Sequence, residues 1–444
     1  MRAACVLLAM VLASGCGQRR ANNASDPVRQ YLRLAVALGE RDPDSLDYYY
    51  GPAEWVADVR ADPPALSVIK QSALGMIDRL QFEAPERQPA AFLIPQLRAI
   101  AARAAFLSGV KSRFDHEAEA LFGVRRQPDI DERKLEQVRK EIARSLPGEG
   151  SLAVRYAQFD QEFLVPPETL SAVMNRAVAE CRARTAAHLS LPPGETVDIE
   201  YVSNKPWSAY SRYLGNYRST IQVNADLPVT VDRALELACH EGYPGHHVIN
   251  VLSDELLVKG RGRSELMAQP TFSPQSFTSE SAATIAAALA FPDGERIAFE
   301  RDVLFPLAGL SKSSVQRYLQ VQRLIEQLEI AEVPIARSYL DGDLEFLRAG
   351  AAFEKDVLMA HPEATLKYLN EYRTYMLTYT WGRSVVRDRV LSGAGTAESW
   401  RNYAAWITSE SPSGLTEGSG LLTSRDRSST RDSGRIPLLP VASN

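Results

Sequence analysis

The spacing of hydrophobic residues predicts a mainly α-helical protein. Apolar side chains recur three or four positions apart in residues 28–36 and 93–104, which places them on one face of a helix. The same pattern predicts further helices over residues 135–146, 295–307, 314–330, 338–353 and 363–391. The segment 48–52, Tyr-Tyr-Tyr-Gly-Pro, is expected to end a helix.

A different pattern follows the Pro-Pro-Gly sequence at residues 192–194. Apolar and polar residues then alternate in three short runs, 197–201, 209–214 and 220–224. Such alternation is typical of strands with one buried side, and Gly215-Asn216 suits a turn between two of them. We therefore expect a small antiparallel sheet, which either binds an extended peptide along its edge or only supports the fold.

These changes of pattern divide the chain into regions. Residues 31–194 form a predicted N-terminal helical region, and residues 195–410 contain the candidate chemistry. Residues 17–30 are polar and are expected to form a tether. Residues 411–444 are rich in Gly, Ser and Arg, which predicts a disordered tail.

Composition narrows the possible classes of function. The chain has 444 residues, of which 45% are hydrophobic, and a net charge of −5. This composition supplies a large core, and nothing in it indicates a membrane-spanning helix in the body of the chain. The lack of a basic patch argues against nucleic acid as a partner.

The first residues predict export. A positively charged start precedes an apolar run over residues 3–12 that is too short to cross a membrane. Residues 13–16, Ala-Ser-Gly-Cys, then resemble a bacterial lipoprotein cleavage site. Residues 1–16 are thus expected to be a lipoprotein signal peptide with Cys16 as the lipidated residue. Gly17 favours the outer membrane, on its periplasmic side; the alternative is a secreted protein.

The cysteines leave room for one disulfide at most. Cys5 would be removed and Cys16 acylated, so Cys181 and Cys239 remain. Because Cys239 lies among apolar residues, it is expected to be a buried thiol rather than a metal ligand. No bridge is expected between the two.

The candidate chemistry is concentrated in residues 240–247, His-Glu-Gly-Tyr-Pro-Gly-His-His. Three of the six histidines of the chain fall there. Imidazole nitrogens bind zinc, and an adjacent carboxylate can take a proton from water. In a straight helix, however, His240 and His246 would be ~9 Å apart along the axis and would point in different directions. Pro244 and Gly245 predict a break that folds His246 back beside His240.

Residues 240–247 resemble the signature of a bacterial family of metallopeptidases, domain-of-unknown-function family 885, whose pattern is His-Glu-x-x-Pro-Gly-His-His. They are also similar to the zinc motif of dipeptidyl peptidase III. The resemblance implies a multi-helix zincin-like, gluzincin-type body in which Zn²⁺ is bound by His240 and His246, with Glu241 as general base. His247 would be an alternative ligand, a residue that supports the ligands from behind, or a substrate contact. The segment with Tyr210 and Asn224 resembles the region before the motif, which implies substrate contacts.

A catalytic zinc ion usually takes three protein ligands. The family has a Glu-Gly-Trp-Ala motif downstream, which implies Glu280 as the third ligand. Here Ser281 and Ala282 replace the glycine and tryptophan of that motif. Small residues around Glu280 would let two helices approach closely. The alternatives are a glutamate that only interacts with its helix N-terminus, or ligation by Glu295 or Glu300.

A further segment, Tyr-Thr-Trp-Gly-Arg at residues 379–383, resembles the Tyr-x-x-Gly segment of the family. Tyr379 and Arg383 are four residues apart and share one helical face. Either could stabilise an oxyanion beside the metal; the alternatives are packing for Tyr379 and a surface ion pair for Arg383. Residues 328–330 lack the aspartate and histidine that the family often has there.

The sequence therefore predicts an exported zinc metallopeptidase that hydrolyses peptides with metal-activated water and is attached to the membrane by a lipid. A zinc hydrolase of another amide, such as a cell-wall peptide, is one alternative. A non-catalytic envelope lipoprotein that binds metal or peptide is another.

Overall fold

The computed structural model describes residues 26–409, except 84, 87, 126–129, 206 and 392–395. The predicted signal peptide, the lipidation site Cys16, the tether up to residue 25 and the tail from residue 411 lie outside the described residues. The last residues assigned to the tether already belong to α2 (Pro27–Arg41). Asp26 caps this helix by accepting a hydrogen bond from the Val28 N–H.

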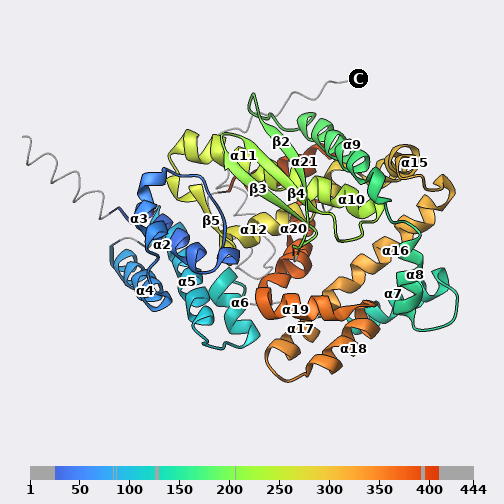
Figure 1. Cartoon of the computed structure of the whole chain (residues 1–444), viewed down its shortest axis with the longest axis horizontal. Coiled ribbons are helices and arrows are strands. Elements are labelled where there is room, and N and C mark those ends of the chain that lie inside the picture. The colour runs from blue at the N-terminus through green and yellow to red at the C-terminus, as the bar shows by residue number, and fades with distance from the viewer. Residues whose placement is uncertain are drawn as a thin grey trace, which may run out of the picture.

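The first helices pack around a core of their own (Figure 1, blue). It lies between α2, α4 (Leu66–Glu83) and α5 (Ala90–Leu107), with the short α3 (Ala57–Ala61) beside them. By length and hydropathy α5 could cross a membrane, but 61% of it is buried inside the molecule. Residues 257–258, 266 and 268 complete this core.

A two-stranded ribbon connects this part to the region that contains the histidine motif at residues 240–247. β1 (Leu46–Tyr49) pairs antiparallel with β5 (Ala268–Pro270). The expected helix end at residues 48–52 was therefore wrong, because Tyr48 and Tyr49 belong to a strand that pairs with a distant segment. Propensity is a weak guide where a tertiary contact of this kind decides the structure.

The three-stranded sheet lies where it was expected, before the metal-binding helix. β3 (Ala209–Gly215) and β4 (Arg218–Asn224) form the predicted hairpin, and Asn216 and Tyr217 have positive φ in its turn. β2 (Thr196–Val202), however, runs parallel to β4 on its other side. The sheet is thus mixed rather than purely antiparallel.

Most of the other described helices contribute to a second, larger hydrophobic core that reaches from residue 114 to residue 407. Its first helices are α6 (Phe114–Phe122), α7 (Glu132–Ser145), α8 (Leu152–Gln161) and α9 (Pro167–Ala186). The segment that contains the histidine motif follows the sheet as α10 (Val231–Leu237), η3 (Ala238–Gly242), α11 (His246–Leu252), η4 (Ser253–Lys259), η5 (Ser264–Met267), α12 (Pro274–Ala283) and α13 (Ala286–Ala290). The regions 31–194 and 195–410 therefore do not have separate cores.

Most of the C-terminal helices lie to the right of the sheet and below it in Figure 1. They are α14 (Asp293–Phe299), η6 (Glu300–Leu304), α15 (Phe305–Leu307), η7 (Lys312–Ser314), α16 (Val315–Leu328), η8 (Glu329–Ala331), α17 (Glu332–Leu340), α18 (Phe346–Val357), α19 (Pro362–Tyr372), η9 (Arg373–Leu377), η10 (Thr378–Gly382), α20 (Arg383–Val390) and α21 (Thr396–Ile407).

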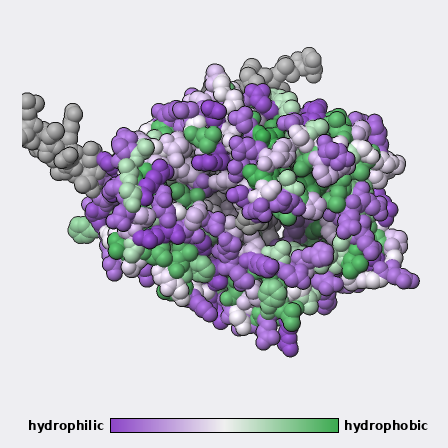
Figure 2. Space-filling model, in the orientation of Figure 1, coloured by the Kyte–Doolittle hydropathy of each residue, from purple (hydrophilic) through white to green (hydrophobic). Residues whose placement is uncertain are grey.

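Two of the predicted helices are divided in the structure. The expected helix 338–353 is broken by a turn in which Gly342 has φ +82°. The expected helix 363–391 bends after Tyr372, where Arg373 has φ 51°. The mainly helical fold that the sequence predicts is nevertheless confirmed. The face shown in Figure 2 is mostly hydrophilic, with hydrophobic residues scattered over it.

Candidate metal centre

A break in one helix creates the site. The α10 helix widens into the π-helical segment η3, which ends at Tyr243 with extended backbone. Gly245 then donates its N–H to the Cys239 carbonyl at 2.9 Å, and its own carbonyl accepts from Ile249 as α11 begins. A Cβ at position 245 would overlap the carbonyl oxygens of His240 and Cys239. Only glycine therefore allows so close a return of the chain.

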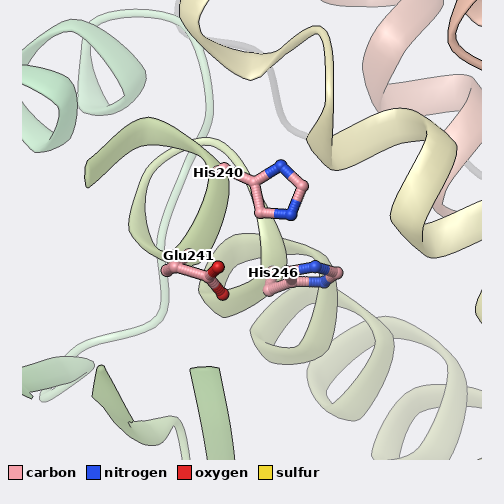
Figure 3. A group of neighbouring side chains, drawn as sticks. All are labelled: His240, Glu241 and His246. Carbon is pink, nitrogen blue, oxygen red and sulfur yellow. The ribbon is translucent and has the colours of Figure 1, made fainter. Parts of the chain in front are cut away.

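The break brings His240 and His246 together as predicted. Their ring centroids lie 4.8 Å apart at an interplanar angle of 78°. The ligand atoms of these two histidines and Glu241 all lie within 4.8 Å of one another, so the three residues could hold a metal ion. Figure 3 shows the three side chains directed into one space beside the broken helix.

A second carboxylate, Glu280 on α12, reaches the same space. Its Oε1 lies 2.9 Å from His240 Nε2, and its Oε2 lies 3.2 Å from His246 Nε2. Tyr375 donates a hydrogen bond of 3.1 Å to Glu280 Oε2. The alternatives lie elsewhere, since Glu295 pairs with Arg184 and Glu300 with Arg296.

The charges of this group favour a cation. Burial acts to raise the pKa of Glu280, but His246 and His240 hold it well below its ordinary value. Burial likewise opposes protonation of His246, yet Glu280 raises the pKa of that imidazole to about 9. The buried carboxylate thus lies between two imidazoles, where a proton or a divalent metal ion can neutralise its charge.

Tyr379 and Arg383, the two predicted catalytic residues of the 379–383 segment, have different surroundings. Tyr379 is 37% exposed, yet burial, with Glu280 and Glu241 among the nearby acidic groups, raises the pKa of its phenol well above the ordinary value. Its ring lies 5.9 Å from that of Tyr375. The Arg383 guanidinium instead pairs with Glu329. Its predicted catalytic role stays a prediction.

The residues predicted to contact substrate have partners within the protein. The Tyr210 hydroxyl donates to Asp47, at 2.6 Å to the carbonyl and 2.7 Å to the carboxylate. Asn224 donates to the carbonyls of Lys205 and Trp207, and so anchors the loop before β3. Substrate contacts for Tyr210 and Asn224 stay predictions.

His247 is directed away from His240 and His246. It is fully buried, its Nδ1 lies 2.8 Å from Ser219 Oγ, and its Nε2 lies 2.9 Å from Glu195 Oε2. Both ring nitrogens thus have partners on the far side of the motif, which leaves neither for a substrate or a shared metal ion.

The expectation of unbridged cysteines was wrong. Cys181 on α9 and Cys239 form a disulfide with Cα atoms 5.6 Å apart. The sequence offered no sign of this, because the pairing depends on α9 packing against η3. Tyr375 and Glu195 were also missed; each is a single residue with no motif around it, far from His240 in sequence.

One of two cavities adjoins the site, because the hydroxyl of Ser279, which lines it, lies 3.5 Å from His246 Nδ1. One is lined by residues of α11, α12 and α21, including Asn250 and Ser279, and the other by residues of α5, α6 and η9, including Arg103 and Arg373. None of His240, Glu241, His246 and Glu280 lines either cavity.

Comparison with known proteins gives a distant likeness in structure. No protein-family model matches the chain, and no curated protein matches it. Among solved structures, one described as "the putative lipoprotein from Colwellia psychrerythraea" matches with a TM-score of 0.43 and 13% identity, over 77% of this chain and 70% of that chain. Membership of family 885 stays a prediction, and the chemistry has to be inferred from the site itself.

Proposed function

We propose that this protein is a zinc-dependent peptidase. The observation that carries the proposal is the convergence of His240 Nε2 and His246 Nε2 on the carboxylate of Glu280, at 2.9 and 3.2 Å. Two imidazoles and one carboxylate are a ligand set of catalytic zinc sites. His240, His246 and Glu280 would hold the ion, and a bound Zn²⁺ would supply a Lewis acid for water and for a carbonyl oxygen.

Glu241 is left free for proton transfer in this assignment. It follows a metal ligand directly and its carboxylate lies within 4.8 Å of the imidazole nitrogens. It accepts a proton from the attacking water and later delivers it to the nitrogen of the leaving amine. Because the carboxylate starts and ends ionised, one residue serves as base and then as acid.

Two tyrosines support this chemistry from η9 and η10. Tyr375 donates to Glu280 Oε2 and so orients the carboxylate toward the histidines. Tyr379 is partly exposed beside Glu280 and Glu241, and its phenol can donate a hydrogen bond to the oxyanion that forms at the scissile carbonyl. Its raised pKa keeps the phenol protonated for this role.

The substrate that we propose is a peptide outside the cytoplasm. The protein itself would be attached to the membrane through a lipid on Cys16. Disulfides persist mainly in oxidising compartments, so the Cys181–Cys239 bridge supports an exported protein. The resemblance of residues 240–247 to family 885 favours peptides over other amides.

The test compares wild-type protein with Glu241→Gln, both in a soluble form that begins at residue 17. Metal content is measured by mass spectrometry, and cleavage is measured on a mixed peptide library. We expect one zinc per chain in both proteins and a loss of cleavage on the order of 10²–10⁴-fold in the variant. Zinc in both without any cleavage would favour a metal- or peptide-binding protein, and no zinc would refute the site.

A further inference from the structure

The turn that folds His246 back beside His240 is held by one carboxylate from another part of the chain. Glu195 lies just before β2, and its side chain is only 2% exposed. Tyr243 precedes the turn and donates its hydroxyl to Glu195 Oε2 at 2.5 Å. His247 follows the turn, with Nε2 2.9 Å from the same oxygen. Glu195 Oε2 thus joins the two ends of the turn.

The other oxygen of Glu195 is held from α9. Arg182 donates to Oε1 through Nε at 2.8 Å and through Nη2 at 2.6 Å. Arg182 and Tyr243 donate to this carboxylate and His247 Nε2 is able to donate to it, so its charge is matched on both oxygens. Arg182 follows Cys181, whose disulfide with Cys239 holds the chain just before His240. The same helix therefore braces the segment on both sides of the metal ligands.

Each partner of Glu195 is itself fixed in place. Ser219 Oγ on β4 lies 2.8 Å from His247 Nδ1, and the ring of Tyr243 packs 4.8 Å from that of His247. Tyr403 on α21 donates to the Pro244 carbonyl at 3.0 Å. Because His247 is buried and has partners at both ring nitrogens, it has little freedom to move. The start of α11, which contains His247, is therefore held at a defined position.

From this geometry we infer that Glu195 is a positioning residue for the metal centre: by clamping Tyr243 and His247 it fixes the place of His246 opposite His240. It rests on the proposed function, because it assumes that His246 binds the metal. Replacing a carboxylate that orients a metal ligand through its neighbours lowers metal affinity, since the ligand spacing must be held to fractions of an ångström.

The experiment measures zinc affinity rather than cleavage. Tyr243→Phe removes one donor to Glu195, and Glu195→Gln removes the charge that holds both ends of the turn. The matched control is Tyr318→Phe, because Tyr318 is equally buried and donates its hydroxyl to Asp232, another buried carboxylate, at the start of α10. Zinc dissociation constants come from competition with a chelator, and Co²⁺ absorption spectra report the ligand geometry.

We expect Tyr243→Phe and Glu195→Gln each to weaken zinc binding by about 10–100-fold and to change the Co²⁺ spectrum. Tyr318→Phe should leave both unchanged even where it lowers the melting temperature. The inference is wrong if Tyr243→Phe and Glu195→Gln both bind zinc as tightly as the wild type. It is also wrong if Tyr318→Phe weakens zinc binding as much as they do. Should Glu195→Gln fail to fold, Tyr243→Phe alone decides.

The outcomes for the wild type separate this inference from the proposed function. Wild-type protein that binds zinc but cleaves no peptide would refute the peptidase and leave the role of Glu195 to be judged by the affinities. Wild-type protein that binds no zinc would refute both.

Discussion

Gly382 lies directly against Ser281, so closely that a Cβ on Gly382 would overlap the serine hydroxyl and lie 3.1 Å from the serine Cβ. This contact joins α12, which carries Glu280, to η10, which carries Tyr379. We expect Gly382→Ala to destabilise the protein by about 1–3 kcal/mol, because the added methyl group overpacks the interface. Ser281→Gly should restore part of the loss. Denaturant unfolding of the two single variants and the double variant measures this coupling, and strictly additive effects would contradict it.

Gly245→Ala should disrupt the metal centre. Its Cβ would meet two backbone carbonyl oxygens, which cannot rotate away as a side chain could. We expect a loss of at least about 3 kcal/mol of unfolding free energy together with loss of zinc binding. Gly75→Ala is the matched control, since nothing lies within 4 Å of a Cβ at that helical position. It should be neutral or stabilising by up to about 1 kcal/mol. Equal effects of the two substitutions would refute the tight turn.

Tyr379→Phe should lower kcat about 10²–10³-fold, as removal of an oxyanion donor does. Zinc content should not change, because Tyr379 is not one of the proposed ligands. Steady-state kinetics on a peptide found by library screening measures the effect. Tyr339→Phe serves as control, since that phenol bonds Asn370 at an exposed position. Wild-type kcat in Tyr379→Phe would remove Tyr379 from the catalytic residues.

The contrast between Glu280 and Glu195 shows which residues of the site can be predicted from the sequence and which cannot. Glu280 could be predicted because a family motif and a need for a third ligand both pointed to it. Glu195 contacts Tyr243 and His247, which are 48 and 52 positions away in the sequence, and no local sequence pattern predicts such contacts. The break at Pro244 and Gly245 was predictable for the opposite reason, since these residues restrict their own backbone.

The strands show the same division. The hairpin of β3 and β4 is local and follows from Gly215-Asn216, whereas β2 finds β4 as a parallel neighbour only through the tertiary fold. The strand β1 was expected as a helix end because its partner, β5, lies some 220 residues later.

The disulfide should stabilise the protein measurably. Cys181 and Cys239 are 58 residues apart, and closing a loop of that length contributes about 4 kcal/mol in the chain-entropy account. In a form that begins at residue 17 they are the only cysteines. We expect no free thiol before reduction and a clear fall in melting temperature after it. The double variant Cys181→Ala, Cys239→Ala should not respond to reductant. Two titratable thiols in the untreated protein would contradict the bridge.

Glu300 should make stability depend on pH in a defined direction. Burial raises its pKa to about 7, although Arg296 beside it acts to lower it, from an ordinary value of 4.5. The folded protein therefore keeps a proton that the unfolded chain releases in this window. Stability from this group is full below about pH 4.5, falls as pH rises toward about 7, and is constant above that.

Glu300→Gln removes this dependence. Relative to the variant, the wild type should lose on the order of 3 kcal/mol between about pH 5 and about pH 8. Denaturant unfolding at both pH values measures the difference. Glu295→Gln is the control, because that side chain is 59% exposed and should show little change. Parallel pH curves for wild type and Glu300→Gln would disprove the raised pKa.

The contacts of Glu195 with Tyr243 and His247, and the ribbon of β1 and β5, also limit where the chain can be divided. Residue 195 looks like a natural place to start a shortened version, because the sequence pattern changes there. Such a fragment would lack β1, the pairing partner of β5, and with it Asp47, which holds Tyr210. It would also lack Cys181 and Arg182, and with them the bridge to Cys239 and the anchor of Glu195. We therefore expect that the histidine motif does not keep its shape when residues 195–410 are produced alone, because several residues that hold it come before residue 195.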